Sequence, residues 1–424
     1  MSRTTPIRKG LSPVLQRRTG KPRAFLAAAL IGLLTGALAT VTPAAAQGSG
    51  DHRAWLEGVK QEAAARGVSQ ATLAAAFEGW QPLPRVIELD RRQPEHTQTF
   101  WSYLDRAVSP ERIRRGRELL VVHKQLLADI ERRYGVQGRF LIAFWGLETN
   151  YGANTGGFPV IDALATLAYD DRRPDFFRAQ LLDALEILES GDIALPRMTG
   201  SWAGAMGQVQ FMPETFRRHA VDGDGDGRRD IWFSLRDAFA SAANFLKAIG
   251  WRGDQTWGRE VRLPPDFDWG LTDLDVRKPV IEWQRLGVRT AEGHALPPVG
   301  FEGSIILPGG HKGPAFLVYD NFRATLGWNR SLFYAVAVGH LADRIAGKGP
   351  FLTPPREDRP LSRQEVAEMQ RLLASHGLDV GMADGVVGAQ TRSALRTFQR
   401  QHDLPPDGYP TAWLLERLRH GRVQ

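Results

Sequence analysis

The stretch FLIAFWGLETNYG, Phe140 to Gly152, carries the strongest signal in the chain. Its first eight residues are apolar on every side of a helix, which indicates a helix buried all round rather than an amphipathic surface helix. Glu148 follows in the last turn, and Gly152 marks a helix stop. Burial and the negative end of the helix dipole both disfavour a charged carboxylate, so we expect Glu148 to stay protonated near neutral pH and to serve as a general acid. The alternative is a glutamate that is exposed at a frayed helix end or paired with an arginine.

Size and charge exclude some classes of function. The chain has 424 residues, 43% of them hydrophobic and 24% charged, which is typical of a soluble globular protein of two or three domains. The net charge of +7 originates in residues 1–46, which hold seven basic residues and no acidic ones. Without this segment Lys+Arg falls from 54 to 47, against 47 Asp+Glu, so nucleic acid is not an expected partner.

The first 46 residues have the pattern of an export signal. A basic start, an apolar stretch from Ala24 to Val41 and the small residues from Thr42 to Ala46 predict cleavage before Gln47. An uncleaved inner-membrane anchor is the alternative, and Arg17-Arg18 is a poor match to a twin-arginine signal. The chain has no cysteine for a disulfide or a lipid anchor. We therefore expect a periplasmic protein.

Apolar periodicity predicts an α+β fold that is mostly helical. Helical spacing dominates from Asp51 to about Gly250, for example along Gly116–Ile130, and returns at Arg330–Ala346. Between about 260 and 319, short apolar runs such as Val280-Ile281 are interrupted by Pro and Gly and predict a small β region. A first, larger domain is accordingly placed over 51–347.

The C-terminal part of the chain predicts a second, smaller domain. Residues 348–360 are rich in proline and charge and predict a semi-rigid linker. Residues 361–420 then carry two helix faces, and we expect a compact helical domain.

The run GSWAGAMGQVQFMP, Gly200 to Pro213, combines small, polar and aromatic residues. Small residues allow close approach of backbone or ligand, Ser201 and Gln210 offer neutral hydrogen-bonding groups, and Trp202 offers a flat apolar face. This mixture suits a sugar, which has hydroxyls at its rim and apolar faces. The alternative is a tightly packed corner whose small residues serve packing alone.

The run DGDGDGRRDIWF, Asp222 to Phe233, resembles a calcium-binding loop in its spacing of acidic residues. Phe233 stands where such loops have a bidentate glutamate, and Asp237 in the following helix is the candidate replacement. We predict a structural Ca²⁺ here, and the alternative is a solvated acidic turn. The candidate metal-binding residues are Asp222, Asp224, Asp226, Arg228 (through its backbone carbonyl), Asp230 and Asp237.

These motifs, in this order, resemble the membrane-bound lytic murein transglycosylase B family over residues 51–347. Further matching runs are FWSYL (Phe100 to Leu104), DALATLAYD (Asp162 to Asp170) and GWNRSLFYA (Gly327 to Ala335). The tail resembles a small three-helix peptidoglycan-binding domain through QRLLASHGL (Gln370 to Leu378) and LPPDG (Leu404 to Gly408). The resemblance implies a lysozyme-like catalytic domain over 51–347 and a C-terminal domain that tethers it to its polymer and raises the local substrate concentration.

The resemblance also implies the reaction. Members of this family cleave the β-1,4 bond between N-acetylmuramic acid and N-acetylglucosamine without adding water, and they leave a 1,6-anhydromuramyl end. Glu148 matches the family's single catalytic acid and base. Ser201 and Gln210 match polar groups that line its cleft, and Asn329 matches one close to the reacting sugar. Trp328 stands where relatives commonly have tyrosine, which puts a hydroxyl contact in doubt and leaves stacking on the sugar as the contact that this residue could make.

Other residues are candidates for substrate contact on weaker grounds. Arg172 and Arg173 would meet substrate carboxylates, with a surface ion pair as the alternative. Tyr103, Tyr151 and Trp202 are expected either at the substrate or in the core.

Two other functions stay open at this stage. The same site could hydrolyse the bond as a muramidase, or the chain could bind the wall without turnover. No metalloprotease, serine-hydrolase or phosphate-loop motif is present, and the chemistry needs no cofactor. The expected partners are peptidoglycan glycan strands and proteins of cell-wall synthesis or remodelling, and we expect a monomer.

Overall fold

The computed structural model describes residues 51–91, 98–356 and 359–420. The predicted export signal lies outside these residues. Within them, no helix is both long and apolar enough to cross a membrane.

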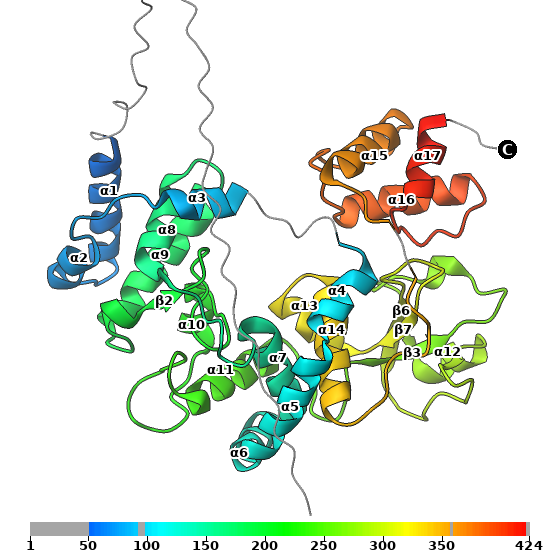
Figure 1. Cartoon of the computed structure of the whole chain (residues 1–424), viewed down its shortest axis with the longest axis horizontal. Helices are drawn as coiled ribbons and strands as arrows, with labels where there is room; N and C mark the ends of the chain where they lie inside the picture. Colours follow the sequence, from blue (N-terminus) through cyan, green and yellow to red (C-terminus); the bar gives the residue numbers. More distant parts are fainter. Residues whose placement is uncertain (1–50, 92–97, 357–358, 421–424) are drawn as a thin grey trace, which may run out of the picture. The chain divides into compact units, whose positions relative to one another are not determined.

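Most of the described chain is helical (Figure 1). The helices before the sheet are α1 Asp51–Ala65, α2 Gln70–Ala76, α3 Pro84–Arg91, α4 Phe100–Ala107, α5 Pro110–Val122, α6 Lys124–Tyr134, α7 Gly138–Thr149, α8 Val160–Tyr169, α9 Pro174–Glu189, α10 Pro213–His219 and α11 Leu235–Ala248. A two-stranded pair, β1 Phe158–Pro159 and β2 Thr199–Gly200, joins the start of α8 to the loop that precedes α10.

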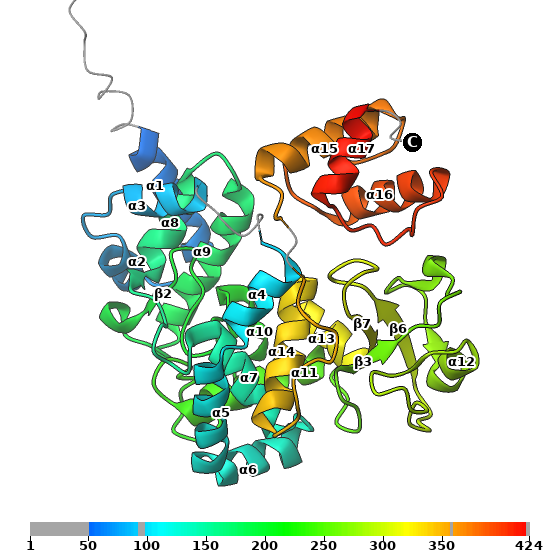
Figure 2. The same cartoon turned by 45° about the vertical axis from the view of Figure 1, so that its right-hand side comes forward.

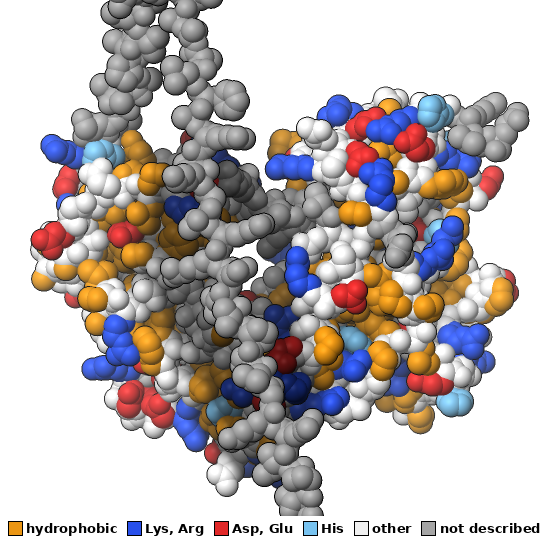
Figure 3. Space-filling view, in the orientation of Figure 1, with side chains coloured by type: hydrophobic (Ala, Val, Ile, Leu, Met, Phe, Trp, Pro, Cys, Tyr) orange, Lys and Arg blue, Asp and Glu red, His pale blue; other side chains and the backbone are white. Residues whose placement is uncertain are grey.

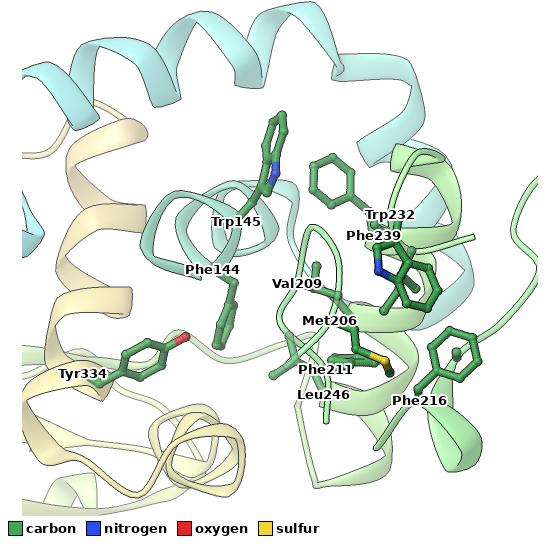
Figure 4. Close-up of a cluster of buried hydrophobic side chains, with 14 of the residues drawn as sticks. Phe144, Trp145, Met206, Val209, Phe211, Phe216, Trp232, Phe239, Leu246 and Tyr334 are labelled. Carbon is green, nitrogen blue, oxygen red and sulfur yellow. The ribbon is translucent and has the colours of Figure 1, made fainter. Parts of the chain in front are cut away.

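Helix α7 lies at the centre of this body, because its apolar residues leave no face for water. It packs against α5, α6, α11 and α14 (Leu332–Ile345), which surround it in both views of the chain (Figures 1 and 2). All residues from Phe140 to Gly146 are buried. Figure 4 shows Phe144 and Trp145 on α7 facing different parts of the core. Each such buried side chain contributes about 1.5–3 kcal/mol of hydrophobic stabilisation.

The end of α7 is set by left-handed backbone rather than by glycine alone. Asn150 has φ 51° and Tyr151 has φ 61°, and Gly152 continues the turn at φ 83°. Asparagine tolerates this conformation better than most residues, so Asn150 ends the helix one residue after Thr149. Glu148 is thereby held in the last turn.

The helical stretch predicted over Gly116–Ile130 is two helices in the structure. Helix α5 ends at Val122 and α6 begins at Lys124, with His123 between them. Val121 and Val122 are exposed at this break. The apolar spacing of the two helices is nearly in phase across the break, which made the segment look continuous.

The small β region is one antiparallel sheet with strand order β4-β6-β7-β3-β5. Its strands are β3 Gly258–Arg262, β4 Lys278–Pro279, β5 Arg289–Thr290, β6 Glu302–Ile306 and β7 Ala315–Val318. The central register pairs Ile305 with Leu317, and Arg259 with Leu317 on the other side. Val280-Ile281, predicted as part of this β texture, instead begins α12 Val280–Arg285, whose Trp283 is buried under the sheet.

Two helices lead from the sheet back to the central body. Helix α13, Asp320–Trp328, follows β7, and α14 returns along α7. This return brings the residues near 330 next to Glu148, about 180 positions earlier in the sequence.

The C-terminal domain has its own core of apolar residues. It consists of α15 Arg363–Ser375, α16 Ala389–Gln401 and α17 Ala412–His420. A capping box begins α15, in which Ser362 accepts from the backbone of Glu365 and the Glu365 side chain accepts from the backbone of Ser362. Met369, Leu395 and Leu415 are fully buried at its centre. Its surface mixes basic and acidic side chains (Figure 3).

Candidate active site

Glu148 is held by two hydrogen-bond donors that both reach the same carboxyl oxygen. The indole Nε1 of Trp328 donates to Oε1 at 2.9 Å, and the hydroxyl of Tyr334 donates to Oε1 as well. The second oxygen, Oε2, has no hydrogen-bond partner among the described residues. When the group is protonated, its proton therefore belongs on Oε2, which accepts no hydrogen bond from the described residues.

The environment of Glu148 keeps its carboxyl partly protonated near neutral pH. Burial raises the pKa of Glu148 from 4.5 to about 7, and the hydrogen bonds from Tyr334 and Trp328 oppose this rise. The pKa of Tyr334 is raised well above its usual value, first by burial and then by the neighbouring Glu148 charge, so this hydroxyl keeps its proton and acts as a donor. A pKa close to neutrality is the value that a general acid and base requires.

Both donors are fixed by packing. Trp328, the last residue of α13, lies 4.6 Å from Phe144 between ring centroids, and 5.4 and 5.3 Å from Phe211 and Phe245. Tyr334 is buried in the first turn of α14, and its oxygen points toward Phe144 in Figure 4. The sequence did not predict that Trp328 and Tyr334 donate hydrogen bonds to Glu148. A tyrosine within the apolar run that forms α14 is the one sequence signal that could have indicated it.

The glycine-rich run from Gly200 to Pro213 lies against the end of α7. The hydroxyl of Thr149 donates to the carbonyl of Gln208 at 3.0 Å. The Gln208 side chain accepts from the indole of Trp145 at 2.8 Å and donates to the carbonyl of Trp232 at 3.0 Å. These three bonds hold the run, the helix with Glu148 and the acidic loop in one arrangement.

The predicted sugar contacts in this run are engaged in its own turn structure. Ser201 accepts from the backbone N–H of Ala205 at 3.0 Å and so closes a tight turn, and Trp202 is half-buried beside it. Gln210 has φ 50° and donates to the carbonyls of Thr155 and Gly207. The glycines are needed here, because a Cβ on Gly156 would lie 2.0 Å from the carbonyl oxygen of Gly200.

Asn329 and Tyr103 line a cavity that also reaches Tyr334. Asn329 accepts from the backbone N–H of Ser331 at 3.1 Å, and the ring of Tyr103 packs 5.8 Å from that of Phe333. The structure thus places these two predicted residues in the same cavity lining as Tyr334, which donates to Glu148.

Tyr151 makes its contacts within the protein. Its hydroxyl donates to the carbonyl of Arg112 at 2.6 Å, and its ring fills the space left by Gly116 and Gly146. Burial raises the pKa of the Tyr151 hydroxyl. The structure therefore places Tyr151 between α5 and α7. Of its two expected locations, the substrate and the core, this is the core.

Arg172 and Arg173 form ion pairs within the protein, which was the alternative to contact with substrate carboxylates. Both guanidinium groups lie 2.7 Å from a carboxylate oxygen of Asp90, which is buried. Arg173 also lies over the ring of Phe177. The two arginines join α3 to the segment between α8 and α9.

The acidic loop brings together four of the six candidate metal-binding residues. Oxygens of Asp222, Asp224, Asp226 and Asp237 lie within 4.8 Å of one another. Asp237 is fully buried and accepts from the backbone N–H groups of Gly223 and Asp230. The carboxylate of Asp230 instead accepts from the backbone of Trp232 and Phe233. Four converging carboxylates with oxygen donors suit a hard divalent cation such as Ca²⁺.

Known protein families match two separate parts of the chain, the helical body with the small sheet and the C-terminal domain. The family model described as "Transglycosylase SLT domain" matches residues 51–343, and that described as "Putative peptidoglycan binding domain" matches residues 362–418. The crystal structure of SltB3 from Pseudomonas aeruginosa in complex with NAG-anhNAM-pentapeptide is 51% identical and has a TM-score of 0.84, over 87% of this chain and 99% of that chain.

Two further relatives are more distant. The membrane-bound lytic murein transglycosylase B of Escherichia coli (strain K12) is 34% identical over 171 residues, which are 39% of this chain and 47% of that protein. The chain thus spans about half the length of this curated relative. The E. coli lytic transglycosylase Slt35, solved in complex with calcium, shares the fold with a TM-score of 0.59 at 24% identity, over 70% of this chain and 93% of that chain.

The fold and the site define a lysozyme-like enzyme built around the carboxyl group of Glu148 and its two hydrogen-bond donors. The chain belongs to the transglycosylase SLT domain family, with a C-terminal domain of the peptidoglycan-binding family. The predicted resemblance to lytic transglycosylase B and the predicted mostly helical α+β fold are confirmed.

Proposed function

We propose that this transglycosylase cleaves the β-1,4 bond between N-acetylmuramic acid and N-acetylglucosamine in peptidoglycan and leaves a 1,6-anhydromuramyl end. The observation that carries the proposal is Glu148, a carboxyl with a pKa of about 7 whose Oε1 accepts from two donors and whose Oε2 accepts from none of the described residues. The family match and the relationship to SltB3, a protein solved with a NAG-anhNAM ligand, support it.

The first chemical step uses Glu148 as an acid. Its Oε2 proton passes to the glycosidic oxygen as the bond from that oxygen to the anomeric carbon of muramic acid breaks. The two donors on Oε1 then stabilise the carboxylate that forms, because charge-assisted hydrogen bonds are about twice as strong as neutral ones.

The second step uses the same carboxylate as a base. It removes the proton from the C6 hydroxyl of the muramyl residue while that oxygen forms a bond to the anomeric carbon. Glu148 is again protonated, and no water is consumed. Enzymes that hydrolyse such bonds use a second carboxyl, which acts as nucleophile or activates water. The pKa of Glu148 is shifted by burial and by the hydrogen bonds from Tyr334 and Trp328. No second carboxylate among the described residues contributes to this shift.

Contacts with the sugars are proposed for the residues that surround this carboxyl. Asn329 and Tyr103 line the cavity that reaches Tyr334, and Ser201, Trp202 and Gln210 belong to the glycine-rich run whose Gln208 accepts from Thr149 at the end of α7. The half-buried ring of Trp202 offers an apolar surface for a sugar face.

Product analysis tests the proposal against hydrolysis. Purified peptidoglycan is digested in water enriched in oxygen-18, by the chain beginning at Gln47 and by its Glu148→Gln variant, and the soluble products are weighed by mass spectrometry. We expect ends lighter by one water, without oxygen-18, from the first protein and none from the variant. Reducing ends that carry oxygen-18 would identify a muramidase, and binding without products from either protein would identify a wall-binding protein.

A structural Ca²⁺ in the acidic loop is part of the proposal. Asp222, Asp224, Asp226 and Asp237 would hold it through carboxylate oxygens. The ion would relieve the repulsion among these groups and fix the loop whose Trp232 carbonyl accepts from Gln208. It takes no part in the chemical steps.

The location proposed for the protein is the periplasm, where its substrate lies. The export signal predicted for residues 1–46 would bring it there. Glycan strands are the proposed partner, and the C-terminal domain is proposed to bind the same polymer.

A further inference from the structure

Gln208 is a half-buried glutamine that joins the end of α7 to the acidic loop. Its side-chain oxygen accepts from the indole of Trp145 at 2.8 Å, and its side-chain nitrogen donates to the carbonyl of Trp232 at 3.0 Å. Its own carbonyl accepts from the hydroxyl of Thr149 at 3.0 Å, and its N–H donates to the carbonyl of Ile231 at 2.9 Å. Both ends of the side chain and both polar groups of the backbone are therefore engaged.

Two glycines allow the backbone to come close to these contacts. A Cβ on Gly152 would lie 2.6 Å from Oε1 of Gln208, and a Cβ on Gly207 would lie 2.6 Å from the carbonyl oxygen of Ile231. Protein interiors packed in this way transmit small displacements rather than absorb them. A shift of the acidic loop is therefore passed through Gln208 to the end of α7.

On the loop side, the link reaches a candidate metal-binding residue. The backbone N–H groups of Trp232 and Phe233 donate to the carboxylate of Asp230 at 3.0 and 2.9 Å. The N–H of Asp230 in turn donates at 2.8 Å to Asp237, one of the four converging carboxylates. Ordering of these carboxylates therefore also orders Asp230 and the Trp232 carbonyl to which Gln208 donates.

On the helix side, the link reaches the turn that carries the catalytic carboxyl. Trp145 lies three residues before Glu148 and Thr149 lies one residue after it, and both donate to Gln208. The two donors to the Glu148 carboxyl come from different elements, the end of α13 and the first turn of α14. The carboxyl meets these donors only if the last turn of α7 is correctly placed. A misplacement of about 1 Å can cost about 100-fold in rate.

We propose that Gln208 is a positioning residue for Glu148, and that it links the placement of this carboxyl to the filling of the acidic loop by Ca²⁺. The inference rests on the proposed function, because it takes Glu148 as the catalytic acid and base. Coupling between two sites is reciprocal, so loss of the Gln208 side chain should weaken both the chemistry and the binding of the cation. Calcium then affects the rate through the position of Glu148, although it takes no part in the chemical steps.

Replacing Gln208 by methionine tests the link, because methionine has nearly the same length and lacks the amide groups. Calorimetry of Ca²⁺ binding to the full chain should give a Kd that is weaker by about fivefold or more in Gln208→Met than in the wild type. At saturating Ca²⁺, kcat for the release of anhydro products should fall by about tenfold or more. KM should stay within about twofold, since Gln208 is assigned no contact with the sugars.

Gln180→Met is the matched control, because Gln180 is a buried glutamine that links two other helices. Its side chain accepts from the backbone N–H of Glu214 at 3.1 Å and so joins α9 to α10. Among the described residues it makes no hydrogen bond with α7 or with the acidic loop. This variant should lose stability in urea unfolding but keep the wild-type kcat and Ca²⁺ Kd, which separates a general loss of packing from a loss of coupling.

The wild type supplies a second test that does not depend on the folding of a variant. Nitrogen-15 NMR of the tryptophan indoles records the N–H of Trp145, which is assigned through the Phe239 ring, 5.2 Å away between centroids. Removal of Ca²⁺ by a chelator should shift this signal, because its acceptor Gln208 is held by the loop. The indole signal of Trp413, exposed in the C-terminal domain, should not move.

Three results would overturn the proposal: an unmoved Trp145 signal, the same Ca²⁺ Kd in Gln208→Met and wild type, or equal losses of kcat in Gln208→Met and Gln180→Met. Failure of the proposed function would appear separately, as the absence of anhydro products from the wild type. The calcium Kd and the Trp145 signal require no turnover, so they report on the link in either case.

Discussion

Replacing Glu148 by glutamine should make the protein more stable at alkaline pH than the wild type, although it removes the catalytic group. The pKa of Glu148 rises from 4.5 to about 7 on folding, chiefly because of burial. This difference corresponds to about 3 kcal/mol of folding free energy at a pH above 7. Glutamine has nearly the same shape and keeps an oxygen that accepts from Trp328 and Tyr334.

The sign of the effect follows from proton binding. Between pH 4.5 and 7 the folded protein holds a proton on Glu148 that the unfolded chain has released, so the free energy of unfolding falls as pH rises through this window. The stability that protonated Glu148 provides is fully present below pH 4.5 and lost above pH 7. The glutamine variant lacks this titration, and all other groups cancel in the comparison.

Urea unfolding, followed by tryptophan fluorescence at pH 5 and at pH 8.5, measures the difference between the two proteins. Relative to wild type, the variant should gain about 2–3 kcal/mol between these two pH values. Glu118→Gln, on the exposed surface of α5, is the control and should change by less than about 0.5 kcal/mol. A difference between wild type and Glu148→Gln that stays constant with pH would refute the raised pKa and with it the role of burial.

Three further predictions concern the surroundings of this group. Tyr334→Phe removes a hydrogen bond that lowers the pKa of Glu148, so the alkaline limb of the profile of kcat/KM against pH should move up by about one to two pH units; an unmoved limb would contradict the contact. Calcium at about 100 times its Kd should stabilise the protein by about 2.7 kcal/mol in thermal unfolding, and Asp237→Asn should abolish the gain; an equal gain in both proteins would place the ion elsewhere. Gly146→Ala places a Cβ 2.7 Å from the ring of Tyr151 and should lower stability by about 1–3 kcal/mol in urea unfolding; Gly157→Ala, which meets open space, is the control, and equal losses in the two variants would disprove the close contact.

The features that could be predicted from sequence are those encoded by neighbouring residues. The apolar run before Glu148 predicts a helix buried on all sides, and α7 is such a helix. The alternation of aspartate and glycine from Asp222 to Asp226 predicts converging carboxylates, and these lie within 4.8 Å of one another together with Asp237. In both cases the spacing along one segment determines the geometry.

The features that could not be predicted depend on contacts between distant segments. Trp328 and Tyr334 lie 180 and 186 positions after Glu148, and only the return of α14 along α7 brings them to its carboxyl. The partner of Arg172 and Arg173 is Asp90, about 80 positions earlier, so the sequence could not decide between substrate and ion pair.

The secondary structure of short apolar runs could not be predicted for a different reason. Val280-Ile281 fits a strand or a helix equally well over two residues, and the burial of Trp283 under the sheet decides for the helix α12.

The central claim is that the fold keeps Glu148 protonated close to neutral pH. Infrared difference spectroscopy on protein labelled with carbon-13 glutamate, wild type minus Glu148→Gln, isolates the carbonyl band of this one carboxyl and follows it from pH 4 to pH 9. Our account predicts a protonated band at pH 6 that disappears with a midpoint near pH 7. A band that disappears near pH 4.5 would show an ordinary exposed glutamate and would contradict the assignment of Glu148 as the acid.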